Sequence, residues 1–143
     1  MPLSDLPRSL NPEKGYIVIA NSRQAPDTSK YDYGSTIMCT ARQQRIVELL
    51  EQGIRSGKKF TVEDMKEIQY DVEDVHARGM LKDLLKAVES VSSELSGDEK
   101  ADLKVMTGLL SGWNGSMDKD SVAASVYSFM MGLFQISLFK DQV

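Results

Sequence analysis

The sequence predicts a mostly α-helical chain that carries one short β-strand near its N-terminus. All four prolines lie within the first 34 of its 143 residues, and this part shows little helical periodicity. From about Ser35 onward, apolar residues recur at the three- and four-residue spacing of amphipathic helices. We therefore expect an extended arm over residues 1–34 and a helical subdomain of about five helices over residues 35–143.

The arm contains the one stretch that predicts a strand, over residues 16–20. Tyr16 and Val18 would face one side of this strand, while Ile17 and Ile19 would face the other. Both faces are apolar, which suits the interior of a sheet, yet no second strand is predicted to pair with it. The chain therefore reads as a piece of something larger, and by itself we expect it to dimerise, exchange strands or leave its first ~30 residues disordered.

The first two helices are predicted over residues 36–53 and from Thr61 onward. Thr61 can cap the free amide groups of the second helix, and Asp64 three residues later completes a capping box. The apolar stripe of this second helix continues to Val75.

Three further helices complete the expected subdomain. Gly79 or a neighbour should separate the second helix from a third, which covers residues 81–95. Ser96 and Glu99 predict a capping box for the fourth helix, and residues 112–116 form a turn. Asp118 or Asp120 is expected to cap the last helix.

The apolar stretch over residues 122–139 is the longest in the chain. It falls short of the ~20 residues of a membrane-spanning helix, so we expect no membrane span. It is interrupted by Ser125, Ser128, Gln135 and Ser137.

Composition excludes several classes of function. A net charge of −4 without a basic cluster argues against nucleic-acid binding. The one cysteine, Cys39, excludes an internal disulfide and a CxxC zinc site, and we expect it to be a small buried thiol. The one histidine, His76, is expected to have a structural or surface role. The acidic run over residues 71–74 lacks the spacing of a calcium loop and predicts a solvated helix face.

Four segments, in the same order along nearly the whole chain, resemble the penicillin amidase (penicillin acylase) family. The family patterns are an LPR-x-x-NP arm with a GYIV-type strand and an AN-x-R turn, an RA-x-RI-x-ELL helix, a T-x-EDM-x-x-IQ-x-DV segment, and WDG-x-M followed by DS-x-AA-x-x-Y. The matching residues are Leu6-Pro7-Arg8, Asn11-Pro12, Gly15-Tyr16-Ile17-Val18 and Ala20-Asn21-Ser22-Arg23, then residues 41–50, then 60–65 with 68–72, and finally 113–117 with 120–127.

This resemblance implies an N-terminal-nucleophile hydrolase with an αββα sandwich and a helical subdomain. Self-cleavage of a precursor frees a serine whose hydroxyl attacks an amide carbonyl, while its own α-amine acts as general base. Such chemistry needs neither histidine nor cysteine. The implied activity is cleavage of the carbon–nitrogen bond of an N-acyl compound, and the family's acyl groups include aromatic acids, acyl chains of homoserine lactones and lipopeptide tails.

Three residues match functional positions of the family. Asn21 matches an asparagine that donates to the oxyanion, although an Asn in this place could also simply start a turn. Arg42 matches an arginine near the nucleophile that holds the polar network of the site, although it could also be a surface arginine of an amphipathic helix. Asp32 lies near the position of an aspartate that binds a structural calcium ion in some members.

The chain departs from the family by lacking the nucleophile, because removal of Met1 would expose Pro2. We expect an internal segment of the large chain, inactive by itself, whose partners are the small chain, the rest of the large chain and an N-acyl substrate. No cofactor is implied beyond structural Ca²⁺ in the complete protein, and the family resemblance suggests a periplasmic or secreted location. The alternative is a non-catalytic helical binding or scaffolding module derived from the same family.

Overall fold

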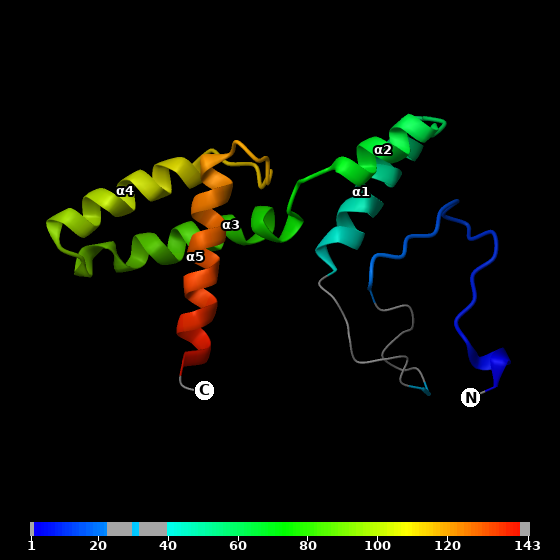
Figure 1. Ribbon diagram of the computed structural model, residues 1–143, viewed down its shortest axis with the longest axis horizontal. Helices are drawn as coiled ribbons and strands as arrows, with labels where there is room; N and C mark the ends of the chain where they lie inside the picture. Colours follow the sequence, from blue (N-terminus) through cyan, green and yellow to red (C-terminus); the bar gives the residue numbers. More distant parts are fainter. Residues whose placement is uncertain (1, 23–29, 32–39, 141–143) are drawn as a thin grey trace. The chain divides into compact units, whose positions relative to one another are not determined.

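The computed structural model describes residues 2–22, 30–31 and 40–140, and these residues are mostly helical (Figure 1). This confirms the mostly α-helical prediction. Among the described residues, β-pairing is limited to an isolated antiparallel bridge between Glu73 and Ser116. The elements are η1 (Leu3–Asp5), α1 (Ala41–Arg55), α2 (Val62–Tyr70), α3 (Val75–Val91), η2 (Ser92–Glu94), α4 (Gly97–Ser111) and α5 (Val122–Phe139), where η marks a 3₁₀ turn.

The chain divides into two compact units, Met1–Asp71 and Val72–Val143. The first holds the arm, α1 and α2, and the second holds α3, α4 and α5. The boundary between arm and helical subdomain, predicted after residue 34, lies outside the described residues and stays a prediction.

The strand predicted over residues 16–20 does not form within the described chain, and its pairing in the sheet of a larger protein stays a prediction. Residues 16–19 belong to no helix or strand, since no second strand of the described chain pairs with them. The expected alternation nevertheless survives: Tyr16 and Val18 are half-buried, whereas Ile17 and Ile19 are exposed. One face of this segment is thus covered and the other is not.

The segment from Tyr16 to Asn21 lies along α1 in the opposite direction. The Tyr16 hydroxyl donates to Glu51 Oε1 at 2.8 Å, and Arg42 Nη2 donates to Asn21 Oδ1 at 2.5 Å. Five extended residues cover about 17 Å, and nine helical residues cover about 14 Å. The two spans match, so the segment from Tyr16 to Asn21 can follow the helix closely while both ends remain bonded to it.

The helix boundaries correct the prediction between residues 70 and 80. The second helix ends at Tyr70, and α3 begins at Val75 and continues through Gly79 without a break. Asp74 causes the new start, because its carboxylate accepts hydrogen bonds from the backbone N–H groups of His76 and Ala77 at 2.8 and 3.1 Å. The acidic run therefore lies between two helices rather than on one helix face.

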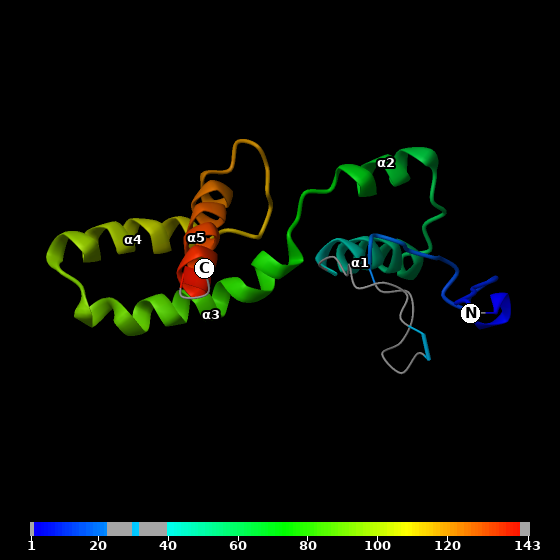
Figure 2. The same cartoon turned by 60° about the horizontal axis from the view of Figure 1, so that its bottom comes forward.

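The core of the second unit is built by α3, α4 and α5. In both views α3 and α4 lie side by side, and α5 crosses them (Figures 1 and 2). Trp113 packs on Tyr127 with ring centroids 5.0 Å apart, and its indole Nε1 donates to the carbonyl oxygen of Ser116. The buried cluster consists of Ala77, Leu81, Leu110 and Tyr127.

Gly115 attaches the turn before α5 to the start of α3. Its φ of +88° lies in the left-handed region, and a Cβ atom there would lie 3.0 Å from the carbonyl oxygen of Asp74. Asp74 N–H donates to the Gly115 carbonyl at 2.9 Å, and Met117 N–H donates to the Val72 carbonyl at 2.9 Å. The turn predicted over residues 112–116 is thus fixed by backbone contacts that a side chain at Gly115 would disturb.

The capping residues of α2 and α4 are those predicted from the sequence, whereas that of α5 is not. Both predicted capping boxes are confirmed, Thr61 with Asp64 on α2 and Ser96 with Glu99 on α4. The last helix is capped by Ser121, whose hydroxyl accepts from the N–H of Ala124, and not by Asp118 or Asp120.

The apolar stretch expected to be too short for a membrane span forms a helix that, by length and composition alone, is long and apolar enough to cross a membrane. It spans 18 residues, of which Ala124 and Tyr127 are buried. Its N-terminal half supplies these core contacts, whereas every residue over positions 133–139 is exposed.

Candidate functional site

Asn21 lies at the end of the arm segment that follows α1, in a backbone conformation that few residues adopt. Its φ is +56°, in the left-handed region, which asparagine tolerates better than other residues with a side chain. Its neighbours Ala20 and Ser22 are both buried, while Asn21 itself is exposed. The buried neighbours fix the backbone, and the left-handed turn directs the Asn21 side chain outward.

Arg42 fixes the orientation of the Asn21 amide. It lies in the first turn of α1, and its Nη2 donates to Asn21 Oδ1 at 2.5 Å. A guanidinium group only donates hydrogen bonds, so the carbonyl oxygen of the amide must face Arg42. The amide nitrogen then presents its two N–H groups away from Arg42, and no described residue accepts from them.

Tyr16 holds the other end of this segment on α1. Its hydroxyl donates to Glu51 at 2.8 Å, and the pKa of Tyr16 is raised, first by this hydrogen bond and then by desolvation and the Glu51 charge. The phenol therefore stays protonated and able to donate over the whole neutral range.

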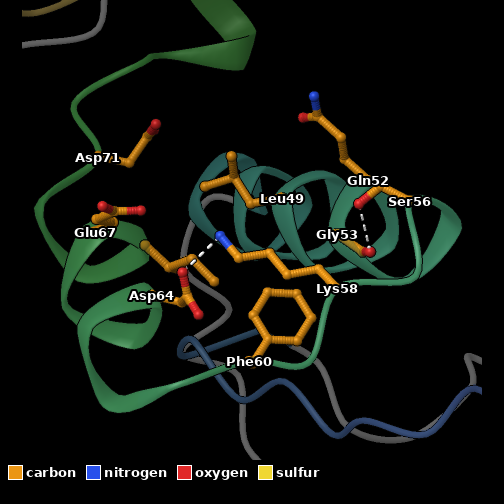
Figure 3. A pocket seen from close by; sticks show the side chains of 10 residues that line it. Leu49, Gln52, Gly53, Ser56, Lys58, Phe60, Asp64, Glu67 and Asp71 are labelled. Carbon is orange, nitrogen blue, oxygen red and sulfur yellow. Dashed lines mark hydrogen bonds and ion pairs between the residues drawn. The ribbon is translucent and has the colours of Figure 1, made fainter.

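A cleft of about 430 Å³ lies between α1 and α2 in the same unit (Figure 3). The Phe60 ring fills the space beside Gly53, where a Cβ atom would lie 2.4 Å from Phe60 Cζ. Figure 3 shows Lys58 reaching past this ring to Asp64, with an ion-pair distance of 2.5 Å. The remaining lining residues are Leu49, Gln52, Ser56, Glu67, Ile68 and Asp71.

Two of the three carboxylates that line the cleft, Asp64 and Asp71, are engaged in structural pairs. Asp64 accepts from Lys58 and from the backbone N–H and hydroxyl of Thr61, and these bonds, Lys58 first, lower its pKa to about 2. Asp71 receives a bidentate pair from Arg45, with Nε and Nη2 each 2.8 Å from a carboxylate oxygen. These pairs stabilise the packing of α2 against α1, and no chemistry is assigned to the cleft.

The remaining residues singled out in the sequence do not gather around Asn21. His76 is exposed at the second position of α3, in the other unit. Asp32 and Cys39 lie outside the described residues, so the calcium role of Asp32 and the burial of Cys39 stay predictions. Within residues 2–22, 30–31 and 40–140, no group of three or more His, Cys, Asp or Glu side chains could hold a metal ion.

The described site is therefore a small polar constellation, an oriented amide on an extended arm supported by a helix. The family model for penicillin amidase matches residues 1–143, so the chain belongs to the penicillin amidase family.

A similar protein is the penicillin acylase 2 proenzyme of Pseudomonas sp. (strain SE83), which is 32% identical over 133 residues. The match covers 90% of this chain but 15% of the relative. No solved structure matches the chain.

The contact between Asn21 and Arg42 is the feature that sequence reasoning missed. The two residues are 21 positions apart, and neither periodicity nor spacing indicates that they touch. No local signal in the sequence indicates it, because the contact depends on how the extended segment lies against α1.

Proposed function

We propose that this chain is part of an amide hydrolase of the N-terminal-nucleophile type that cleaves the carbon–nitrogen bond of N-acyl compounds. The observation that carries the proposal is the Arg42–Asn21 hydrogen bond, which orients the amide while no described residue accepts from its two N–H groups. Membership of the penicillin amidase family supplies the class of reaction.

The proposed role of Asn21 is to donate a hydrogen bond to the oxyanion. When the nucleophile's hydroxyl attacks the amide carbon, its proton passes to the α-amine and the carbonyl oxygen becomes negative. Collapse of this intermediate breaks the carbon–nitrogen bond, and the proton goes to the leaving amine. An amide N–H aimed at the oxygen stabilises the negative charge without itself titrating.

The proposed role of Arg42 is to position Asn21 and to strengthen it as a donor. By donating to Oδ1, the guanidinium prevents the amide from flipping its oxygen toward the oxyanion. It also draws electron density from the amide, which makes the opposite N–H groups better donors, as in other hydrogen-bond chains. Arg42 is therefore a positioning residue that acts through Asn21.

The nucleophile, the second oxyanion donor and the acyl pocket are assigned to other parts of a longer polypeptide. The chain spans about 15% of the length of the Pseudomonas relative, which leaves ample sequence for them. We propose an N-acyl small molecule as the substrate and expect no turnover by the 143-residue chain itself.

The test is a chimera in which this chain replaces the matching segment of the penicillin acylase 2 proenzyme from Pseudomonas sp. (strain SE83). With a chromogenic acyl anilide, Asn21→Ala should lower kcat by about 10²- to 10³-fold, the usual cost of losing one oxyanion donor. Arg42→Lys should lower kcat by a smaller factor, because a single ammonium group can still face Asn21 Oδ1.

Asn11→Ala is the matched control. Asn11 is also exposed and also has a positive φ, +48°, so the substitution changes the same side chain on a similar backbone. It should leave kcat unchanged. A chimera in which Asn21→Ala and Asn11→Ala are equally active would contradict the oxyanion role. Asn21-dependent hydrolysis by the 143-residue chain alone would contradict the expectation that this chain has no turnover by itself.

A further inference from the structure

The extended segment that ends at Asn21 is bonded to α1 at both of its ends. The Tyr16 hydroxyl donates to Glu51 Oε1 at 2.8 Å, in the C-terminal half of the helix. At the other end, Asn21 Oδ1 accepts from Arg42 in the first turn of the helix. Arg42 acts on the Asn21 amide directly, whereas Tyr16 lies five extended residues away, or about 17 Å. The Tyr16–Glu51 bond, here called the Tyr16 tether, can therefore act on Asn21 only through the segment.

The described chain offers little else to hold the segment between its two ends. Residues 17–20 form no backbone–backbone hydrogen bond with any described residue. Ile17 and Ile19 are 57% and 73% exposed, so packing covers only one side of the segment. A segment with few buried contacts and no backbone pairing moves easily. The Tyr16 tether is thus the polar contact that holds the first part of the segment on α1.

The chemistry of the Tyr16 tether suits this role. Its acceptor is a carboxylate, and hydrogen bonds with a charged partner are stronger than those between neutral groups. Glu51 is itself restrained, because its Oε2 lies 3.4 Å from Nη1 of Arg55, one turn further along α1. The Tyr16 side chain is half-buried, which limits the positions of its hydroxyl.

An oxyanion donor needs such a restraint. Its N–H must lie about 2.7–3.1 Å from the oxygen of the intermediate, and a misplacement of about 1 Å can cost about 10²-fold in rate. Asn21 continues directly from the segment, so a shift of residues 16–20 also moves the Asn21 backbone. Its φ of +56° leaves few alternative conformations that could correct the shift.

We infer that Tyr16 and Glu51 are positioning residues for the oxyanion donor and act on Asn21 through the extended segment. This inference rests on the proposed function. The helix α1 then restrains the donor in two ways: Arg42 sets the direction of the amide, and Glu51 sets the position of the segment that carries it. Neither Tyr16 nor Glu51 exchanges a proton or touches the substrate.

The experiment compares variants of the same chimera with a chromogenic acyl anilide. Tyr16→Phe removes the hydroxyl and keeps the ring. It should lower kcat by about 5- to 50-fold and leave KM within about twofold, because the oxyanion forms only during the reaction. In an Asn21→Ala background, Tyr16→Phe should change kcat by less than about twofold, since the segment then carries no donor. A merely structural role would lower kcat by the same factor in both backgrounds.

Glu51 tests the same bond from the side of the helix. Glu51→Ala removes the acceptor and should match Tyr16→Phe, whereas Glu51→Gln keeps an acceptor oxygen and should retain most of the kcat. Tyr16→Phe combined with Glu51→Ala should be no slower than either variant alone, because both remove one bond. Where Tyr16→Phe fails to fold, the two Glu51 variants still decide the inference.

Tyr70→Phe is the matched control. Tyr70 is the last residue of α2 in the same unit, is 80% exposed, and its hydroxyl forms no hydrogen bond with a described residue. Its loss should leave kcat unchanged. Crystal structures of the chimeras give a readout that does not depend on turnover. The Asn21 amide should occupy one position in wild type and in Tyr70→Phe, and it should be displaced or disordered in Tyr16→Phe.

Three results would each overturn the inference: equal activity of Tyr16→Phe and Tyr70→Phe, the same loss from Tyr16→Phe with and without Asn21, or an Asn21 amide that keeps its position in Tyr16→Phe. The proposed function fails separately. If Asn21→Ala is slow but Tyr16→Phe is fully active, the role of the Tyr16 tether alone is overturned. If Asn21→Ala is fully active but Tyr16→Phe displaces the amide, the oxyanion role is overturned and the restraint of Asn21 by Tyr16 is supported.

Discussion

Asp64 lies in the first turn of α2 and faces three hydrogen-bond donors. Lys58 Nζ is 2.5 Å from Oδ1, and the Thr61 backbone N–H and hydroxyl lie 2.7 and 2.8 Å from Oδ2. Together they lower the pKa of Asp64 from 3.8 to about 2, with Lys58 as the largest cause. Since the folded chain favours the carboxylate, its stabilisation is complete above about pH 4 and is lost as the pH falls through about 2.

Asp64→Asn should therefore lower the melting temperature at pH 7 and make it less dependent on pH between about 4 and 2. Thermal unfolding followed by circular dichroism across this range measures both effects. Glu63→Gln is the control, because Glu63 lies beside Asp64 but pairs with Lys66 at the surface. If Asp64→Asn showed the same acid-induced loss as wild type, Asp64 would not be the group that titrates.

At the same scale, the resemblance located Asn21 and Arg42, and the structure places them in contact. The types of the two residues and their places in the sequence do not predict this contact. Asn after a predicted strand favours a turn, and an arginine on an amphipathic helix favours the surface. Their pairing depends on how an extended segment lies against α1, which is a tertiary feature.

At the scale of single elements, interactions within a few residues were predictable and those that needed a distant partner were not. The capping boxes at Thr61 and Ser96 follow from spacing within one turn and are confirmed. The strand over residues 16–20 does not form here, because a strand requires a neighbour and the described chain supplies none. Gly79 does not interrupt α3, since a glycine lowers helix stability by only about 1 kcal/mol.

The cap of α5 gives the prediction for this scale. Ser121 accepts from the Ala124 N–H at 3.2 Å, whereas the carboxylate of Asp120 is exposed and lies 4.0 Å from Lys119. Ser121→Ala should lower the free energy of unfolding by about 1 kcal/mol, the usual value of an N-cap. Urea unfolding measures this loss.

Asp120→Ala serves as its comparison and should change the free energy of unfolding by less than about 0.5 kcal/mol, as exposed substitutions usually do. The opposite ranking, with Asp120→Ala the more damaging variant, would mean that the aspartate caps the helix in solution as the sequence first indicated.

For the whole molecule, the candidate site and the helical core lie in different units. The Asn21–Arg42 bond and the Tyr16–Glu51 bond both lie in Met1–Asp71, while the buried cluster around Leu110 lies in Val72–Val143. Sequence periodicity predicted the helices of both units, but it did not predict where the units divide. The boundary between the units lies in the acidic run, where Asp71 pairs with Arg45 and Asp74 caps α3.

Leu110→Ala tests whether the two units lose structure separately. Leu110 is 1% exposed, and truncating such a leucine to alanine typically costs about 2–5 kcal/mol, because both burial and packing are lost. Hydrogen exchange of the full chain should then show faster exchange of amides in α3, α4 and α5 and unchanged exchange in α1 and α2. Leu109→Ala, at a neighbouring position that is 40% exposed, should have a much smaller effect. Equal acceleration in both units would show that they unfold as one, and the site would then depend on the helical core for its stability.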